Sequence, residues 1–174
     1  WGIQVGVSSN GVSDYRATIR NNIVYRWGWP CFRIGTTNNS DYRDIRVENN
    51  IFQEPVSGSH VVDHRPSTFD GSRFRYSGNR YYSQGPAGSW MRIGSSSMNV
   101  GSWRNAVGES NAVEGAASFP DPNRTLATYN ATLGGPASYQ AFIDRCRQQS
   151  KMNWDSRYTA REVVRYIRAG FGRE

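Results

Sequence analysis

The sequence predicts a mainly β chain made of stacked repeats. Asparagine recurs as Asn22, Asn50 and Asn79, at spacings of 28 and 29 residues. Apolar and polar residues alternate just before each asparagine, which is typical of a strand with one buried face. Asp-Tyr-Arg also recurs, at residues 14–16 and 41–43. A repeat of this length predicts a solenoid, in which each unit buries its apolar face against the next.

Each repeat contains three short apolar runs. The first precedes the asparagine, the second follows it directly, and the third comes later in the repeat. Strands this short cannot form a sheet within one repeat. We therefore expect each to pair with its counterpart in the next repeat, giving three parallel sheets around one core. The runs lie at 17–19, 23–25 and 31–34, at 45–47, 51–53 and 61–62, and at 74–76, 80–82 and 90–93.

Asn-Asn-Ile-Val at residues 21–24 and Asn-Asn-Ile-Phe at 49–52 carry a family resemblance. Together with the apolar alternation before them, they resemble the right-handed parallel β-helix family, the pectate-lyase-like group. The resemblance covers residues 1 to about 100 and implies about three coils of about 28 residues. It also implies that Asn22, Asn50 and Asn79 form a structural ladder at a sharp bend, since asparagine tolerates left-handed backbone and its amide can bond along the stack.

The remainder of the chain departs from the repeat. We expect the coils to occupy residues 1–100, an irregular wrapping segment to occupy 101–137, and a two-helix C-terminal cap to occupy 138–172. Ser138 is a suitable N-cap for the first helix. Thr159 and Glu162 have the spacing of a capping box for the second. Such a cap would cover the exposed end of the stacked sheets.

The C-terminal segments carry a second resemblance. Residues 121–130, 133–135 and 166–171 are similar to the C-terminal tail of large secreted β-helix proteins from environmental bacteria, planctomycetes among them. This resemblance implies a secreted or cell-envelope location. The chain opens in strand-like alternation, with no initiator methionine or signal peptide before it. We therefore expect the remainder of a longer chain at the N-terminus.

The net charge of +7 comes almost wholly from arginine, because Lys151 is the only lysine. Guanidinium groups suit carboxylate or sulfate partners, so an acidic polysaccharide or surface glycan is the expected partner. Nucleic acid is not expected, since the basic residues are dispersed and no nucleic-acid-binding motif is present. Apolar runs are too short to predict a membrane span. Five arginines on predicted strands should line up along a sheet surface: Arg20, Arg33, Arg46, Arg75 and Arg92.

Both histidines fall in one cluster of titratable residues, 60–65. Strand alternation places His60 and His64 on one face and Asp63 and Arg65 on the other. A polysaccharide lyase needs a base and a positive group that neutralises the substrate carboxylate. The candidate base is His64 or Arg65. The alternative is a purely structural role, in which both histidines form local hydrogen bonds at a turn.

Three further residues complete the candidate site. Arg33 and Arg92 could neutralise the carboxylate, and His60 is assigned to substrate binding. A glycoside hydrolase would instead use paired carboxylates, for which Asp63 is one candidate. In either case, we expect the main site of such an enzyme to lie upstream of this fragment.

No cofactor is expected, because no metal-ligand spacing is present. A stack of Asp14, Asp41 and Asp70 could hold Ca²⁺ between repeats, although no motif indicates it. The Asp-Tyr-Arg context more simply predicts an Asp–Arg charge pattern on a turn. Cys31 and Cys146 make no disulfide framework, so two buried free thiols are expected.

Two functions remain open from the sequence. The first is a carbohydrate-binding or carbohydrate-active protein, with lyase or hydrolase activity on acidic polysaccharide. The alternative is a non-catalytic structural or adhesive cell-envelope protein. The sequence leaves open whether the chain is an enzyme.

Overall fold

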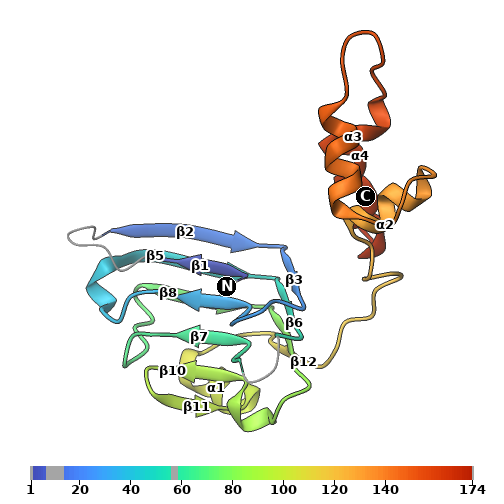
Figure 1. Ribbon diagram of the computed structural model, residues 1–174. Coiled ribbons are helices and arrows are strands. Elements are labelled where there is room, and N and C mark those ends of the chain that lie inside the picture. Colours follow the sequence, from blue (N-terminus) through green and yellow to red (C-terminus); the bar gives the residue numbers. More distant parts are fainter. Residues whose placement is uncertain (1, 7–13, 56–58, 174) are drawn as a thin grey trace. The chain divides into compact units, whose positions relative to one another are not determined.

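The computed structural model describes residues 2–6, 14–55 and 59–173 of the chain. Two compact units are present, Trp1–Ala117 and Ser118–Glu174. Strands dominate the first unit and helices the second (Figure 1). The three-part division at residues 100 and 137 stays a prediction.

Three sheets make up the first unit (Figure 1). Within the described residues every strand pair is parallel, except that β11 runs antiparallel to β10. The five-stranded sheet has the order β1 (Ile3–Val5), β4 (Phe32–Ile34), β7 (Val62–His64), β10 (Met91–Ile93) and β11 (Ser96–Met98). The four-stranded sheet has the order β12 (Val113–Glu114), β9 (Arg80–Tyr82), β6 (Ile51–Gln53) and β3 (Ile23–Tyr25). The three-stranded sheet has the order β2 (Tyr15–Arg20), β5 (Tyr42–Glu48) and β8 (Phe74–Ser77).

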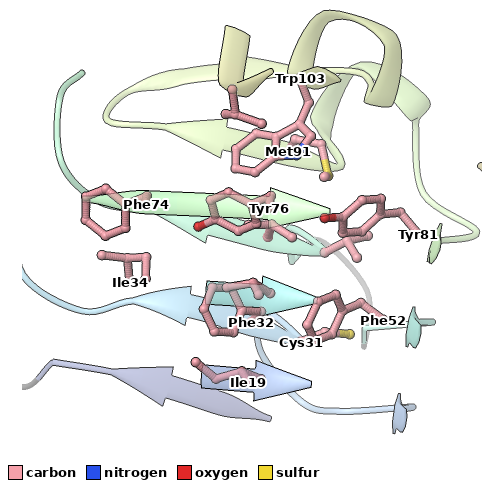
Figure 2. Packing of buried hydrophobic residues seen from close by; sticks show 14 of the residues in the cluster. Ile19, Cys31, Phe32, Ile34, Phe52, Phe74, Tyr76, Tyr81, Met91 and Trp103 are labelled. Atoms are coloured by element: carbon pink, nitrogen blue, oxygen red, sulfur yellow. The ribbon is translucent and has the colours of Figure 1, made fainter. Parts of the chain in front are cut away.

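Equivalent residues of successive repeats pair in register, so similar side chains form columns in the core. Phe52 stacks on Tyr81, its partner in the next repeat, with ring centroids 6.0 Å apart, and it also packs across the core on Phe32 of the five-stranded sheet, at 5.6 Å (Figure 2). Apolar residues at alternate strand positions, such as Ile45 and Val47, are fully buried. Burying such columns is the main favourable contribution to folding.

Helix α1 (Val100–Val107) adds Trp103 to this core. The Asn99 side chain caps its first turn, and Gly108 ends it in left-handed backbone with φ 65°. The Trp103 ring meets the edge of Tyr76 with ring centroids 5.0 Å apart (Figure 2). Strand β12 then pairs with β9. The segment after residue 100 therefore contains a helix and part of a fourth repeat, where an irregular segment had been predicted.

The second unit contains α2 (Leu126–Thr132), α3 (Tyr139–Arg147) and α4 (Ala160–Gly170). Its own cluster includes Tyr129, Phe142 and Val163. Ser138 caps α3 by accepting a hydrogen bond from the Ala141 amide. Three 3₁₀ turns complete the described elements: η1 (Asn39–Asp41), η2 (Ala87–Ser89) and η3 (Ser156–Tyr158).

The capping box predicted for the last helix was wrong. The Thr159 hydroxyl donates to the Ser156 carbonyl at 2.9 Å and makes no capping bond to α4. The capping box of this unit lies instead at α2, between Thr125 and Thr128.

The predicted fold class, mainly β, was wrong. Helices and strands each account for 27% of the structure, so the chain is mixed α/β. The two helices predicted within residues 138–172 are present as α3 and α4, whereas α2 lies in the preceding segment, where no helix was predicted. The described residues form three sheets of mostly parallel strands and four α-helices. This arrangement does not support the assignment to the right-handed parallel β-helix family or to the secreted planctomycete-like proteins.

Candidate anion-binding site

The register of the five-stranded sheet brings Arg33, Asp63 and Arg92 side by side. Asp63 pairs with Arg33 across β4 and β7, and with Arg92 across β7 and β10. Arg33 Nε lies 3.3 Å from Asp63 Oδ2, and Arg92 Nε lies 2.8 Å from Asp63 Oδ1. Asp63 is only 2% exposed. One buried carboxylate therefore orients two guanidinium groups.

These three residues line a depression of about 280 Å³, here called the arginine depression. It holds three arginines and one aspartate, so positive charge is in excess. Burial lowers the pKa of Arg33; Asp63 offsets part of this effect, and Arg65 and Arg92 lower the pKa further. The site thus favours an added anion. Its lining consists of Trp29, Pro30, Arg33, Ser59, His60, Asp63, Arg65 and Arg92.

His60 faces the arginine depression in one defined tautomer. Its Nδ1 lies 2.6 Å from the Ser89 carbonyl oxygen, which can only accept a hydrogen bond. Nδ1 therefore carries the proton, and Nε2 is the acceptor nitrogen of the neutral ring. His60 lies before β7 begins at Val62.

Tryptophan is exposed beside this site. Trp29 and Trp27 belong to the segment between β3 and β4, and are 63% and 46% exposed. Trp29 lines the depression. Exposed indole rings offer large, flat apolar surface, which can stack on the face of a sugar ring or on a cation.

His64 does not belong to this depression. It is fully buried, and its ring meets Phe74 edge-on with ring centroids 4.6 Å apart. Burial lowers the pKa of His64 to about 4. The prediction that His60 and His64 share a face was wrong, because alternation along β7 turns Val62 and His64 inward, whereas His60 precedes the strand. In this structure His64 cannot contact a polymeric substrate.

The other predicted site residues do come together. Arg33, His60, Asp63, Arg65 and Arg92 all line the arginine depression. Asp63 is the only carboxylate among the described residues that line it, so this site lacks the paired carboxylates of a glycoside hydrolase. Asp63 is also engaged by two arginines, which suits a positioning role better than proton transfer.

The predicted ridge of five arginines is divided between two sheets. Arg33 and Arg92 belong to the five-stranded sheet, whereas the other three lie on β2, β5 and β8. Arg46 and Arg75 are direct neighbours across β5 and β8. Arg46 forms two bonds with Asp44, at 3.1 and 3.0 Å.

The three asparagines are joined by hydrogen bonds. Oδ1 of Asn50 accepts from the backbone amide and Nδ2 of Asn22, each at 3.0 Å, and Asn79 repeats both contacts with Asn50. The left-handed backbone falls one residue earlier, at Asn21, Asn49 and Gly78. The explanation that the ladder asparagines themselves adopt this conformation was therefore wrong.

Glu109 ends this ladder and was missed from the sequence. Its Oε1 accepts from the amide and Nδ2 of Asn79 at 3.2 and 2.7 Å, and its Oε2 accepts from Trp103 Nε1 at 2.9 Å. Burial raises the pKa of Glu109, and hydrogen bonds from Asn79, Trp103 and Tyr81 offset part of that effect. The available clue was its position 30 residues after Asn79, close to the repeat length.

Two of the three aspartates proposed for calcium, Asp14 and Asp70, are engaged with arginine. Asp14 accepts a hydrogen bond from Arg43 Nε of the neighbouring repeat at 2.8 Å, and Asp70 accepts one from Arg73 Nε at 2.9 Å. In the part of the chain that the structure describes, no group of three His, Cys, Asp or Glu side chains is placed to hold a metal ion.

The two cysteines are free thiols. Cys31 is buried, and burial raises its pKa to about 12. Cys146 is only partly buried, so the expectation of two buried thiols holds for Cys31 alone. Across the described ranges, each helix is too short or too polar to cross a bilayer.

The chain matches no protein-family model, no curated protein and no solved structure.

Proposed function

We propose that this chain binds acidic polysaccharide at the arginine depression. The observation that supports the proposal is the buried Asp63, which orients Arg33 and Arg92 while leaving the site with a positive excess. Arg65 adds a third guanidinium, and Trp29 adds an exposed ring at the rim. Guanidinium pairs recognise carboxylate or sulfate through parallel hydrogen bonds, and the indole ring favours a sugar over a small inorganic anion.

Arg65→Gln tests the proposal without disturbing the Arg33–Asp63–Arg92 cluster. The probes are polygalacturonate, alginate and a sulfated glycan, with dextran as the neutral comparison, and binding is followed by calorimetry at two salt concentrations. Loss of one charge-assisted contact should weaken binding about tenfold or more. Binding of the wild type should also weaken as salt rises.

Arg104→Gln is the matched control, because Arg104 is an exposed arginine on α1 outside this depression. It removes the same charge and should leave affinity within about twofold, since a distant exposed charge acts only through screened electrostatics. Equal losses in the two variants would mean that net charge, and not this site, attracts the glycan. Equal affinity for dextran and the acidic glycans would contradict the proposal outright.

A lyase reaction at the same depression is a second candidate function, and the His60 geometry favours it. His60 lines a site whose arginines could neutralise a uronate carboxylate, and its Nδ1 is engaged by the Ser89 carbonyl, which leaves Nε2 as the candidate base nitrogen. A base and a neutralising cation are the groups that removal of the proton alpha to that carboxylate requires. The test is the absorbance of unsaturated products from each acidic glycan. Activity that disappears in His60→Gln while glycan binding remains supports it, and no product from any glycan rejects it.

A further inference from the structure

A second, larger depression adjoins the first. It encloses about 630 Å³ and shares Ser59 with the arginine depression. A hydrogen bond also connects them, because His60 of the first bonds the carbonyl of Ser89, which lines the second. The lining of this second hollow, here called the Trp90 depression, includes Arg26, Glu54, Ser59, Gln84, Ser89 and Trp90.

The charges of the Trp90 depression cancel. Its described lining residues include one arginine and one carboxylate, and Arg26 Nε bonds Glu54 Oε2 at 3.1 Å. The pair lies across neighbouring repeats, 28 residues apart. Charge balance makes this hollow a poor site for a second anion, in contrast to its neighbour.

Its remaining polar groups are hydroxyls and an amide. The serines and Gln84 can each donate and accept hydrogen bonds, as the hydroxyls of a neutral sugar require. Trp90 is held in place in the lining, since its Nε1 donates to the Gly85 carbonyl at 2.9 Å and its ring meets the Tyr82 ring edge-on. Small-molecule sites commonly combine an aromatic wall with a few polar groups that fix the orientation of the ligand.

We propose that the two depressions form one groove that takes an acidic sugar and a neutral sugar in succession. The acidic unit occupies the arginine depression and the neutral unit occupies the Trp90 depression. This inference rests on the proposed function and deepens it, because it selects mixed glycans over polymers made of acidic sugars alone. Ser59, which lines both depressions, marks the point where the glycosidic bond passes from one depression to the other.

The experiment compares glucuronic acid with an oligosaccharide that alternates glucuronate and N-acetylglucosamine, by NMR titration of the wild type and two variants. The oligosaccharide should bind at least about tenfold more tightly than the monosaccharide. Gln84→Ala should remove much of that gain and leave monosaccharide affinity unchanged. Gln148→Ala, which truncates an exposed glutamine at the end of α3, is the matched control and should keep the full gain.

Glu54→Gln provides an independent arm. It removes the carboxylate that balances Arg26, so the Trp90 depression becomes cationic, and preference should move toward oligogalacturonate, in which every sugar is acidic. Two results would overturn the two-part groove and leave the proposed function standing. The first is an oligosaccharide that binds no better than glucuronic acid. The second is a gain in oligosaccharide affinity that survives both Gln84→Ala and Glu54→Gln. Failure of every acidic probe to bind overturns both.

Discussion

At the scale of single residues, position relative to the core decides what each titratable group can do. His60 and His64 lie in one short segment, yet one faces a surface depression and the other lies among aromatic rings. Tyr76 Oη lies 3.4 Å from Nδ1 of His64. An imidazole in such surroundings remains neutral, because the charged form would lose its hydration.

Acid should therefore destabilise the first unit through His64. Burial lowers its pKa from 6.5 to about 4, with a smaller opposing effect from the Thr68 backbone. Between these values the unfolded chain binds the proton and the folded chain does not, so stability falls as pH decreases from 6.5 toward 4. The loss by pH 4 should be on the order of 3 kcal/mol.

Urea unfolding of the wild type and of His64→Leu between pH 4 and 7 measures this effect. Glu109 acts in the opposite direction, because its raised pKa adds stability at low pH that is lost as pH rises. Since Glu109 is present in both proteins, the difference between their pH slopes isolates His64. Identical slopes would show that His64 is not a buried neutral histidine.

At the scale of elements, α1 and the asparagine ladder are connected through Glu109. The Trp103 indole and the Asn79 amide both donate to the same carboxylate. Val113 pairs with Arg80, so Ala112, the residue before Val113, occupies the ladder position of the partial fourth repeat. Alanine has no side-chain amide with which to continue the ladder. Glu109, just after the C-cap of α1, supplies the acceptor in its place. The helix thus completes the hydrogen bonding of the last full repeat.

Glu109→Gln should lower the free energy of unfolding by about 1–3 kcal/mol, because its amide group would place a donor opposite a buried donor. In the Trp103→Phe background the cost should be smaller, since that donor is already absent. Urea denaturation of the four proteins gives the coupling energy. Glu114→Gln, at an exposed position on β12, is the matched control and should change stability by less than about 0.5 kcal/mol. Equal costs of Glu109→Gln in both backgrounds would contradict the coupling.

The sequence predicted the strands well because their alternation and repeat spacing are local. The elements it missed depend on longer-range context. Helix α1 is short, and only Asn99 and Gly108, its caps, indicate its ends. Arg33, Asp63 and Arg92 were each singled out, but their contact depends on register between strands about a repeat apart. The burial of His64 could have been predicted, because strand alternation places it on the same face as the apolar Val62.

At the scale of the whole molecule, the two units have separate apolar clusters. The first centres on the three sheets and α1, and the second on α2, α3 and α4. All residues of the proposed groove belong to the first unit. Small units bury a limited fraction of their surface and are correspondingly marginal in stability. Because the groove lies in the first unit, unfolding of the helical unit should leave glycan binding intact.

Phe142→Ala tests this independence. The Phe142 ring packs against Tyr129 and Tyr158, with centroids 5.9 and 5.3 Å away, and its removal should cost about 3–5 kcal/mol. Hydrogen exchange followed by mass spectrometry should then show lost protection in α2, α3 and α4, with the sheets unchanged. Ile45→Ala, in the core of the first unit, should give the reverse pattern. Binding of acidic glycan should survive Phe142→Ala, because the arginine depression keeps its supporting sheet. Loss of protection in the sheets of the Phe142→Ala protein would instead mean that the two units fold as one cooperative structure.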